Sequence, residues 1–159
     1  MDTPKWWKVE GSGALGMLMG EFHHTLDGKG RLILPSRFRE LLTEGFVITR
    51  GLEKCLFVYT NEQWAKVQER LQNLAFTNAT NRAFIRFFLS GAIDCQLDKQ
   101  GRVLLPQNLR DYAKLQREAV IIGVLDRLEI WDQTSWEAYR DNTDEDFENL
   151  AEQLDGFWE

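Results

Sequence analysis

Apolar and polar residues alternate with a period of two along several short stretches of the chain, a pattern typical of half-buried β-strands. Four such strands are predicted in the first half of the sequence, at residues 22–26, 31–34, 46–49 and 56–59. Residues 27–30 form the predicted tight turn between the first two strands, and Gly51 lies between the other two. The strands are therefore expected to form two short hairpins.

Helices are predicted where apolar residues recur every three and four positions. Pro35 suits the first turn of a short helix that runs to about Leu42, because proline needs no amide donor there. Asn61 is the expected N-cap of a longer helix. Its apolar face consists of Trp64, Val67, Leu71 and Leu74. Residues 78–90 predict another amphipathic helix.

The same order of elements occurs twice. The segment LDGKGRLILP at residues 26–35 aligns with LDKQGRVLLP at residues 97–106 at an offset of 71, and six of the ten positions are identical. The correspondence continues at an offset of 72, pairing Gly51 with Gly123, Leu56 with Leu128 and Trp64 with Trp136. A chance match would not extend over that length, so the chain contains a tandem repeat.

The second copy predicts the same elements as the first. Its strands are expected at residues 93–97, 103–105, 119–122 and 128–131, with helices from Pro106 and from about Thr134. A module of roughly fifty residues has a small core and is marginally stable alone. We therefore expect an α+β fold in which the two halves complete one β-barrel about a pseudo-twofold axis, with flanking helices.

These patterns divide the chain into four predicted segments. Residues 17–91 hold the first repeat and its linking helix, and residues 92–140 hold the second repeat. Residues 141–159 form an acidic tail, in which Phe147, Leu150, Ala151 and Leu154 predict a further amphipathic helix. Residues 1–16 show no periodicity and are expected to be disordered or extraneous.

Charge is spread unevenly along the chain. Residues 141–159 contain eight acidic residues and no lysine or arginine, whereas the rest of the chain has 19 basic and 17 acidic residues, a net charge of +2. The overall net charge of -6 argues against indiscriminate coating of nucleic acid. The apolar runs are too short to cross a bilayer, so we expect a cytoplasmic protein.

Few patterns of catalytic or metal chemistry are present. Cys55 and Cys95 are far apart and belong to no C-x-x-C pair, so they are expected to be buried thiols rather than zinc ligands or a disulfide. The chain has no G-x-x-x-x-G-K-[ST], G-x-S-x-G or H-E-x-x-H motif. We expect neither an enzyme nor a bound cofactor or metal.

The element that both copies share most closely is the turn D-x-x-G-R. Asp27 and Asp98 open the turns, where a carboxylate can accept hydrogen bonds from amides two or three residues on. Gly30 and Gly101 are expected to supply the positive φ that closes each hairpin. These four residues are therefore interpreted as structural.

Cations gather around both turns. They are Lys29, Arg31, Lys99 and Arg102, and the helices that follow the prolines add Arg37, Arg39 and Arg110. A solvated turn tolerates positive charge, and the helix arginines could pair with Glu40, Glu44 or Asp111 instead of a ligand. Because Gly-Arg occurs in both copies, the preferred interpretation is a two-pronged surface that binds DNA phosphates and guanine edges.

Three segments of the chain strongly resemble the MraZ family, bacterial regulators whose two halves each carry the swapped-hairpin fold also seen in AbrB-type regulators. They are MGEFHHTLDGKGRLILPSRFRE, FFLSGAIDCQLDKQGRVLLPQNLRDYA and LEIWD, and the resemblance runs from about Met17 to the end. It implies that Lys29 and Arg31 contact DNA. In the second copy, Lys99 takes the place of Gly28 and Gln100 that of Lys29, so Arg102 is the safer contact there.

The resemblance also implies a biological role. It points to transcriptional control of the division and cell-wall gene cluster through direct repeats in the promoter upstream of the protein's own gene, and hence to a nucleoid-associated regulator. It further implies closed rings of identical subunits, in which several prongs meet successive repeats. The helices around Phe84, Phe87, Phe88 and Phe147 are either subunit contacts or ordinary core.

Two other classes of function remain open from the residues. The two-pronged face could bind an acidic protein, as in antitoxin-like partners, and a stable partner in a pull-down would favour that interpretation. A purely structural ring is also compatible with the sequence, although it leaves the paired Gly-Arg turns unexplained. Salt-sensitive binding to promoter repeats would favour DNA.

Overall fold

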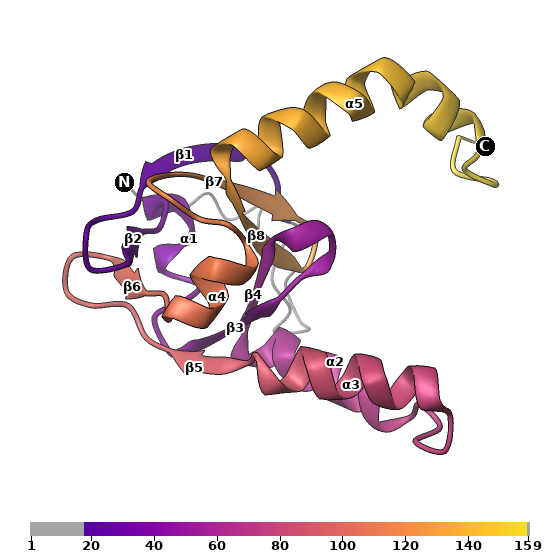
Figure 1. The fold of residues 1–159 in the computed structure, drawn as a ribbon, viewed down its shortest axis with the longest axis horizontal. Helices are drawn as coiled ribbons and strands as arrows, with labels where there is room; N and C mark the ends of the chain where they lie inside the picture. The colour runs from indigo at the N-terminus through magenta and orange to yellow at the C-terminus, as the bar shows by residue number, and fades with distance from the viewer. Residues whose placement is uncertain (1–17, 159) are drawn as a thin grey trace.

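The computed structural model describes residues 18–158, so the expectation for residues 1–16 lies outside the described part of the chain. These residues form an α+β fold around a six-stranded antiparallel sheet, as the sequence predicts (Figure 1). The strand order across the sheet is β1-β7-β8-β4-β3-β5. The strands are β1 (Glu21–Thr25), β7 (Glu118–Val124), β8 (Arg127–Asp132), β4 (Leu56–Thr60), β3 (Phe46–Arg50) and β5 (Ile93–Cys95).

The two halves of the chain exchange strands within this sheet. The first strand of the first half, β1, pairs with β7 of the second half. The first strand of the second half, β5, pairs with β3 of the first half. The hairpins β3-β4 and β7-β8 meet where β4 pairs with β8. Interchanging the equivalent strands of the halves therefore gives the same strand order read from the other edge of the sheet, as an approximate two-fold relation requires.

A second, two-stranded sheet also joins the halves. It consists of β2 (Arg31–Ile33) and β6 (Arg102–Leu104), which run antiparallel with Leu32 opposite Val103. The prediction that residues 31–34 return along residues 22–26 is therefore wrong, because the described residues show only one isolated bridge there, between Leu26 and Leu32. Local periodicity identifies a strand but carries no information about its partner, and here the partner is 71 residues away. We call this sheet the β2-β6 ribbon.

The large sheet has a separate apolar layer on each face, because successive side chains of a strand point to opposite sides. One face, with Phe46 and Ile48 of β3, packs with the ribbon residues Leu32 and Val103. The other face carries an aromatic layer. It consists of Phe57, Tyr59 and Trp131 with Phe88, Trp64 and Trp136 from the helices. The ribbon is therefore fixed to the body by one face and leaves its other face outward.

The helices follow the predicted order, with two differences. They are α1 (Ser36–Arg39), α2 (Asn61–Gln72), α3 (Ala79–Ser90), α4 (Gln107–Tyr112) and α5 (Gln133–Glu152). The predicted N-cap Asn61 is wrong by one residue, since Thr60 accepts the capping bond from the Gln63 amide. The separate tail helix is also wrong, because α5 continues unbroken into the tail. No glycine or proline interrupts residues 133–152, and so nothing ends the helix between the two predicted segments.

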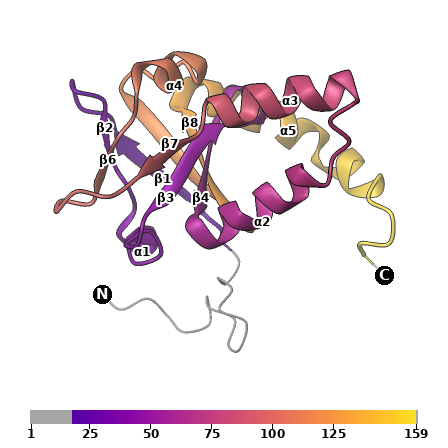
Figure 2. The same ribbon diagram turned by 90° about the horizontal axis from the view of Figure 1, so that it is seen from below.

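The helices α2, α3 and α5 extend beyond the sheet at the end of the molecule opposite the ribbon (Figures 1 and 2). Phe88 is only 6% exposed and belongs to the core, whereas Phe84, Phe87 and Phe147 are 43%, 53% and 63% exposed. Trp136 anchors α5 to the sheet by donating to Glu21 of β1 at 2.8 Å. Within residues 18–158, no helix is both long enough and apolar enough to span a membrane.

The central pair of the ribbon is expected to contribute strongly to stability. Leu32 is fully buried, so Leu32→Ala removes apolar contacts and leaves a cavity, at a cost of about 2–5 kcal/mol in the free energy of unfolding. Ile33 is the matched control, since it lies on the outward face of the same strand and is 39% exposed. Ile33→Ala should cost less than about 1 kcal/mol. Urea unfolding followed by tryptophan fluorescence measures both values, and equal losses would contradict this arrangement of the core.

Candidate nucleic-acid interface

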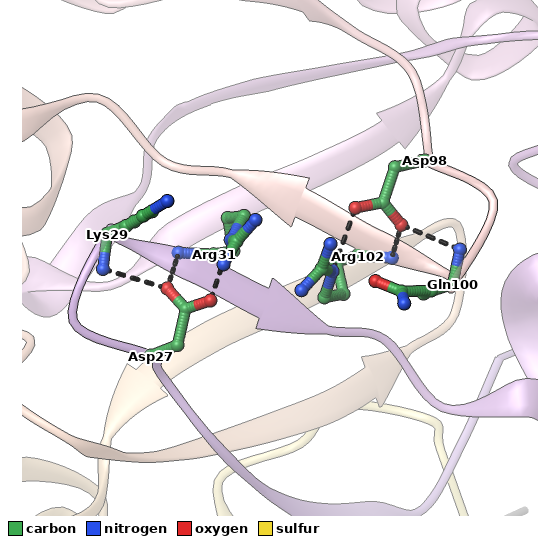
Figure 3. Close-up of polar contacts among 6 residues, drawn as sticks. All are labelled: Asp27, Lys29, Arg31, Asp98, Gln100 and Arg102. Atoms are coloured by element: carbon green, nitrogen blue, oxygen red, sulfur yellow. Dashed lines mark hydrogen bonds and ion pairs between the residues drawn. The ribbon is translucent and has the colours of Figure 1, made fainter.

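The first D-x-x-G-R turn is organised by one carboxylate. Asp27 Oδ1 accepts hydrogen bonds from the backbone amides of Lys29 and Arg31, both at 2.9 Å. Asp27 Oδ2 accepts from Nε of Arg31 at 2.6 Å (Figure 3). Asp27 therefore fixes both the backbone of the turn and the direction in which the Arg31 guanidinium leaves the strand.

The second turn repeats this geometry in the other half. Asp98 Oδ1 accepts from the amides of Gln100 and Arg102 at 2.9 Å, and Asp98 Oδ2 accepts from Nε of Arg102 at 2.8 Å (Figure 3). Gln100 thus occupies the position that Lys29 has in the first turn, as the sequence alignment predicts. The two turns have the same backbone bonds but present different side chains at this position.

The carboxylates are held in their charged form. The hydrogen bond from the Arg31 amide, followed by the bonds from the Arg31 side chain and the Lys29 amide, lowers the pKa of Asp27 to about 2. The amide and side chain of Arg102 and the amide of Gln100 likewise lower the pKa of Asp98. Both turns therefore keep their charge-assisted bonds at any physiological pH.

The two arginines lie on the same outward face of the β2-β6 ribbon. Leu32 and Val103, which form the central cross-strand pair, point into the core at 0% and 2% exposure. The neighbouring residues on each strand therefore point outward. They are Arg31 opposite Leu104, and Ile33 opposite Arg102. Leu104 is 60% exposed, so this face combines two guanidinium groups with two apolar side chains.

Each of these guanidinium groups is only partly used within the protein. The side chains of Arg31 and Arg102 are 31% and 24% exposed. Within residues 18–158, the structure gives each of them one ion pair, through Nε to the aspartate of its own turn. The Nη edge of both groups is consequently left to donate to an external acceptor.

The other predicted contacts are placed differently. Lys29 and Lys99 lie exposed in the turns, and Arg37 is half-buried on α1. Arg110 packs over Gly30 of the opposite half and donates from Nε to the Leu105 carbonyl oxygen at 2.9 Å. The structure thus brings Lys29, Arg31, Lys99 and Arg102 to the turns and ribbon, and places Arg110 behind one turn.

Sequence reasoning named Arg37, Arg39 and Arg110 together, whereas in the structure Arg39 is the equivalent of Arg110. Arg39 packs over Gly101 and donates from Nε to the Leu34 carbonyl oxygen at 2.9 Å, which mirrors Arg110. The repeat offset of 71 pairs Arg39 with Arg110, and it pairs Arg37 with Asn108. That offset was the signal that could have identified this pair.

The predicted structural residues occupy the expected backbone conformations. Gly30 has φ +84° and Gly101 has φ +77°, a region that favours glycine. Among the described residues, no three His, Cys, Asp or Glu side chains gather as metal ligands. The chemistry that the surface offers is therefore that of outward N–H donors on a rigid two-stranded ribbon.

Negative charge lies at the far end of the molecule. The acidic residues of α5 are on the helix that extends away from the sheet, opposite the ribbon (Figures 1 and 2). The acidic tail is therefore not adjacent to Arg31 and Arg102, and interactions between exposed charges weaken with distance. The ribbon end of the molecule is consequently suited to an anionic ligand.

The chain is similar to known proteins over most of its length. A family model described as "MraZ protein, putative antitoxin-like" matches residues 17–87 and again residues 88–157. A protein of Moorella thermoacetica, named transcriptional regulator MraZ, is 55% identical over 141 residues, which cover 89% of this chain and 99% of the relative. A protein of the same name from Desulforamulus reducens is 54% identical over 138 residues, which cover 87% of this chain and 97% of the relative. With two matches to the family model and these identities, the chain belongs to the MraZ family.

Proposed function

We propose that this protein is a sequence-specific DNA-binding transcriptional regulator that reads DNA with the outward face of the β2-β6 ribbon. The observation that carries the proposal is the placement of Arg31 and Arg102. Both lie on one face of the ribbon, related by the approximate two-fold relation of the halves, and among residues 18–158 their ion pairs use Nε alone. The relatives' name, transcriptional regulator, supports the same function.

A two-stranded antiparallel ribbon is one of the two elements that the major groove of B-DNA admits. Arginine can donate two hydrogen bonds to O6 and N7 of guanine, and apolar side chains can contact the methyl group of thymine. Arg31 and Arg102 supply the first kind of contact, and Ile33 and Leu104 the second. The two turns lie at opposite ends of the ribbon (Figure 3), and their exposed residues Lys29 and Lys99 would bind the phosphates on either side.

The aspartates make the arginines more selective. A free arginine side chain loses much rotamer entropy on binding, but Asp27 and Asp98 already hold the Nε atoms at 2.6 and 2.8 Å. The Nη1 and Nη2 atoms are the donors that a bidentate guanine contact uses, and the aspartates leave them unoccupied. The preordered guanidinium therefore favours a base that matches its fixed direction.

The proposed targets follow from the family resemblance. They are direct repeats in the promoter upstream of the protein's own gene, within the division and cell-wall gene cluster, and the protein would act in the cytoplasm in association with the nucleoid. Each half contributes one Gly-Arg turn, and the turns differ at Lys29 and Gln100. One subunit therefore presents two related but unequal contacts to one repeat.

We also infer that the halves form the swapped-hairpin barrel expected from the family. The support is the reciprocal exchange of strands, in which β1 pairs with β7, β5 with β3, and β2 with β6. Neither half has a complete sheet of its own, because each first strand pairs in the other half. The ribbon exists only when both halves are folded together.

Several subunits are proposed to assemble into a closed ring. The groove between α2 and α3 is lined by Leu71, Leu74, Phe76, Ile85 and Leu89. The acidic part of α5 exposes Phe147 and Leu150, and Leu154 is exposed just beyond its end. Arg70, Arg82 and Arg86 lie on α2 and α3. Apolar side chains and opposite charges thus favour α5 of one subunit on the α2-α3 hairpin of the next. Such a contact joins two different surfaces, and it closes into a ring when the rotation permits.

A decisive test of the DNA-binding proposal is fluorescence anisotropy with a fragment that carries the candidate promoter repeats. Wild type should bind with a steep salt dependence, and the Arg31→Ala/Arg102→Ala variant should lose at least about thirtyfold in affinity, because each bidentate contact contributes about 1–3 kcal/mol. The variant should also lose its preference for the repeats over a scrambled fragment.

The matched control for that experiment is Lys66→Ala, which removes one exposed cation from α2, away from the ribbon. Its affinity should equal that of wild type. If the arginine variant binds DNA as tightly as wild type while remaining folded, the ribbon does not read DNA. A stable protein captured on the ribbon face would then favour the alternative of an interaction module.

The proposed ring predicts a dependence on exposed aromatic residues of the helices. Phe147→Ser or Phe84→Ser should shift the mass measured by size-exclusion chromatography with light scattering toward the 18.6 kDa of a single chain. Leu125→Ser is the control, since Leu125 is 60% exposed in the β7-β8 turn, outside these helices. If both helix variants keep the wild-type mass, the subunits assemble through another surface.

A further inference from the structure

Each Gly-Arg turn is covered by an arginine from the opposite half of the chain. A Cβ atom added to Gly30 would lie 2.8 Å from Cζ of Arg110, and one added to Gly101 would lie 2.5 Å from Nε of Arg39. Real Cβ atoms essentially never approach so closely. The guanidinium groups therefore rest directly on the glycine backbone, and a Cβ at either glycine would have to displace the arginine from its hydrogen bond.

Hydrogen bonds fix both partners in this contact. The Nε atoms of Arg39 and Arg110 donate to the carbonyl oxygens of Leu34 and Leu105, which directly follow the ribbon strand of their own half. The glycine carbonyls accept from the other half as well: Gly101 from the Leu34 amide at 3.0 Å, and Gly30 from the Leu105 amide at 2.9 Å. Each glycine is thus held by its carbonyl and covered on its Cα by the same strand-helix segment.

This arrangement explains why glycine is needed at Gly30 and Gly101 on two grounds. The positive φ of +84° and +77° favours glycine at the turn. Separately, a Cβ at either position would push aside the arginine of the opposite half that lies on the Cα. The second requirement comes from the opposite half of the chain and is invisible in either repeat alone.

We propose that Arg39 and Arg110 are positioning residues that set the two DNA-reading turns relative to each other, a role that rests on the proposed function of the ribbon. Arg31 directly follows Gly30, and Arg102 directly follows Gly101, so a shift of the covered glycine moves the reading arginine with it. Displacements of about 0.5 Å already degrade a binding site. Arg110 is thereby reinterpreted from a DNA contact to a brace behind the turn of the other half.

Lysine substitutions separate a brace from a phosphate contact. Arg39→Lys and Arg110→Lys keep the positive charge but lose both the planar guanidinium and the Nε donor. A brace should not tolerate lysine, and we expect DNA affinity to fall about tenfold in each variant. Arg140→Lys, the same change at a 46% exposed side chain on α5 that contacts neither turn, should leave affinity unchanged.

Hydrogen exchange in the free protein provides a readout that does not depend on DNA. Arg110→Lys should accelerate amide exchange in residues 27–31, in the first half, and leave residues 98–102 close to wild type. Arg39→Lys should do the reverse. A general loss of stability would instead raise exchange in both turns, and that result would overturn the brace.

A double-mutant cycle tests the contact itself. The strain of a positive φ accompanies Gly101→Ala in every background, so it cancels from the comparison. In the Arg39→Ala background, Gly101→Ala should weaken DNA binding at least about fivefold less than it does in wild type, because the clash has been removed. In the Arg110→Ala background, where the missing arginine covers the other glycine, the effect of Gly101→Ala should be the same as in wild type.

The possible results distinguish this proposal from the proposed function. Lysine variants that bind as wild type, with alanine variants that lose affinity and about 0.9 of the salt slope per site, would show phosphate contacts and overturn the brace. If each lysine variant accelerates exchange only in the turn of the opposite half, but the protein does not bind the promoter repeats, the brace is supported and DNA reading is refuted. The same exchange pattern together with weakened DNA binding by the lysine variants supports both the brace and the DNA-binding function.

Discussion

The pairing of β2 with β6 is the interaction on which the rest of this structure depends. Leu32 and Val103 meet at its centre with 0% and 2% exposure, and they join the ribbon to the main core. Because side chains alternate along a strand, burial of this central pair forces Arg31 and Arg102 outward together. The core of the protein and the orientation of its candidate binding surface therefore result from the same contact.

Polar contacts refine this arrangement at three levels. Asp27 and Asp98 hold the backbone of each turn and the Nε atoms of Arg31 and Arg102. Arg39 and Arg110 cover the glycines of those turns from the opposite half. Backbone bonds from Leu34 and Leu105 then tie each turn to the end of the other strand. The contacts of Arg39 and Arg110, and the backbone bonds of Leu34 and Leu105, join one half to the other. Neither repeat can therefore form the surface alone.

The distribution of charge and apolar surface separates two roles along the molecule. The ribbon end presents cations, while α2, α3 and α5 extend from the opposite end with exposed aromatic residues and the acidic tail (Figures 1 and 2). A net charge of -6 is therefore compatible with binding an anion, because eight of the 25 acidic residues lie in the tail at residues 141–159, and Asp27 and Asp98 at the ribbon are paired with Arg31 and Arg102. Subunit contacts at the helical end would leave every ribbon accessible, which multivalent binding to repeats requires.

The sequence by itself determined the tandem repeat, the family, the α+β class and nearly all of the strands and helices, because period and turn chemistry are local properties. It also identified Asp27, Gly30 and their equivalents as turn residues, since an Asx-type turn is encoded within five positions. Only the tertiary structure decided that β2 pairs with β6 rather than with β1, that α5 is continuous, and that Arg39 and Arg110 cover Gly101 and Gly30. Two identical patterns 71 residues apart can pair within a copy or between copies. Which of the two pairings forms depends on how completely each buries the apolar side chains of the strands, and burial is determined only by the complete tertiary structure.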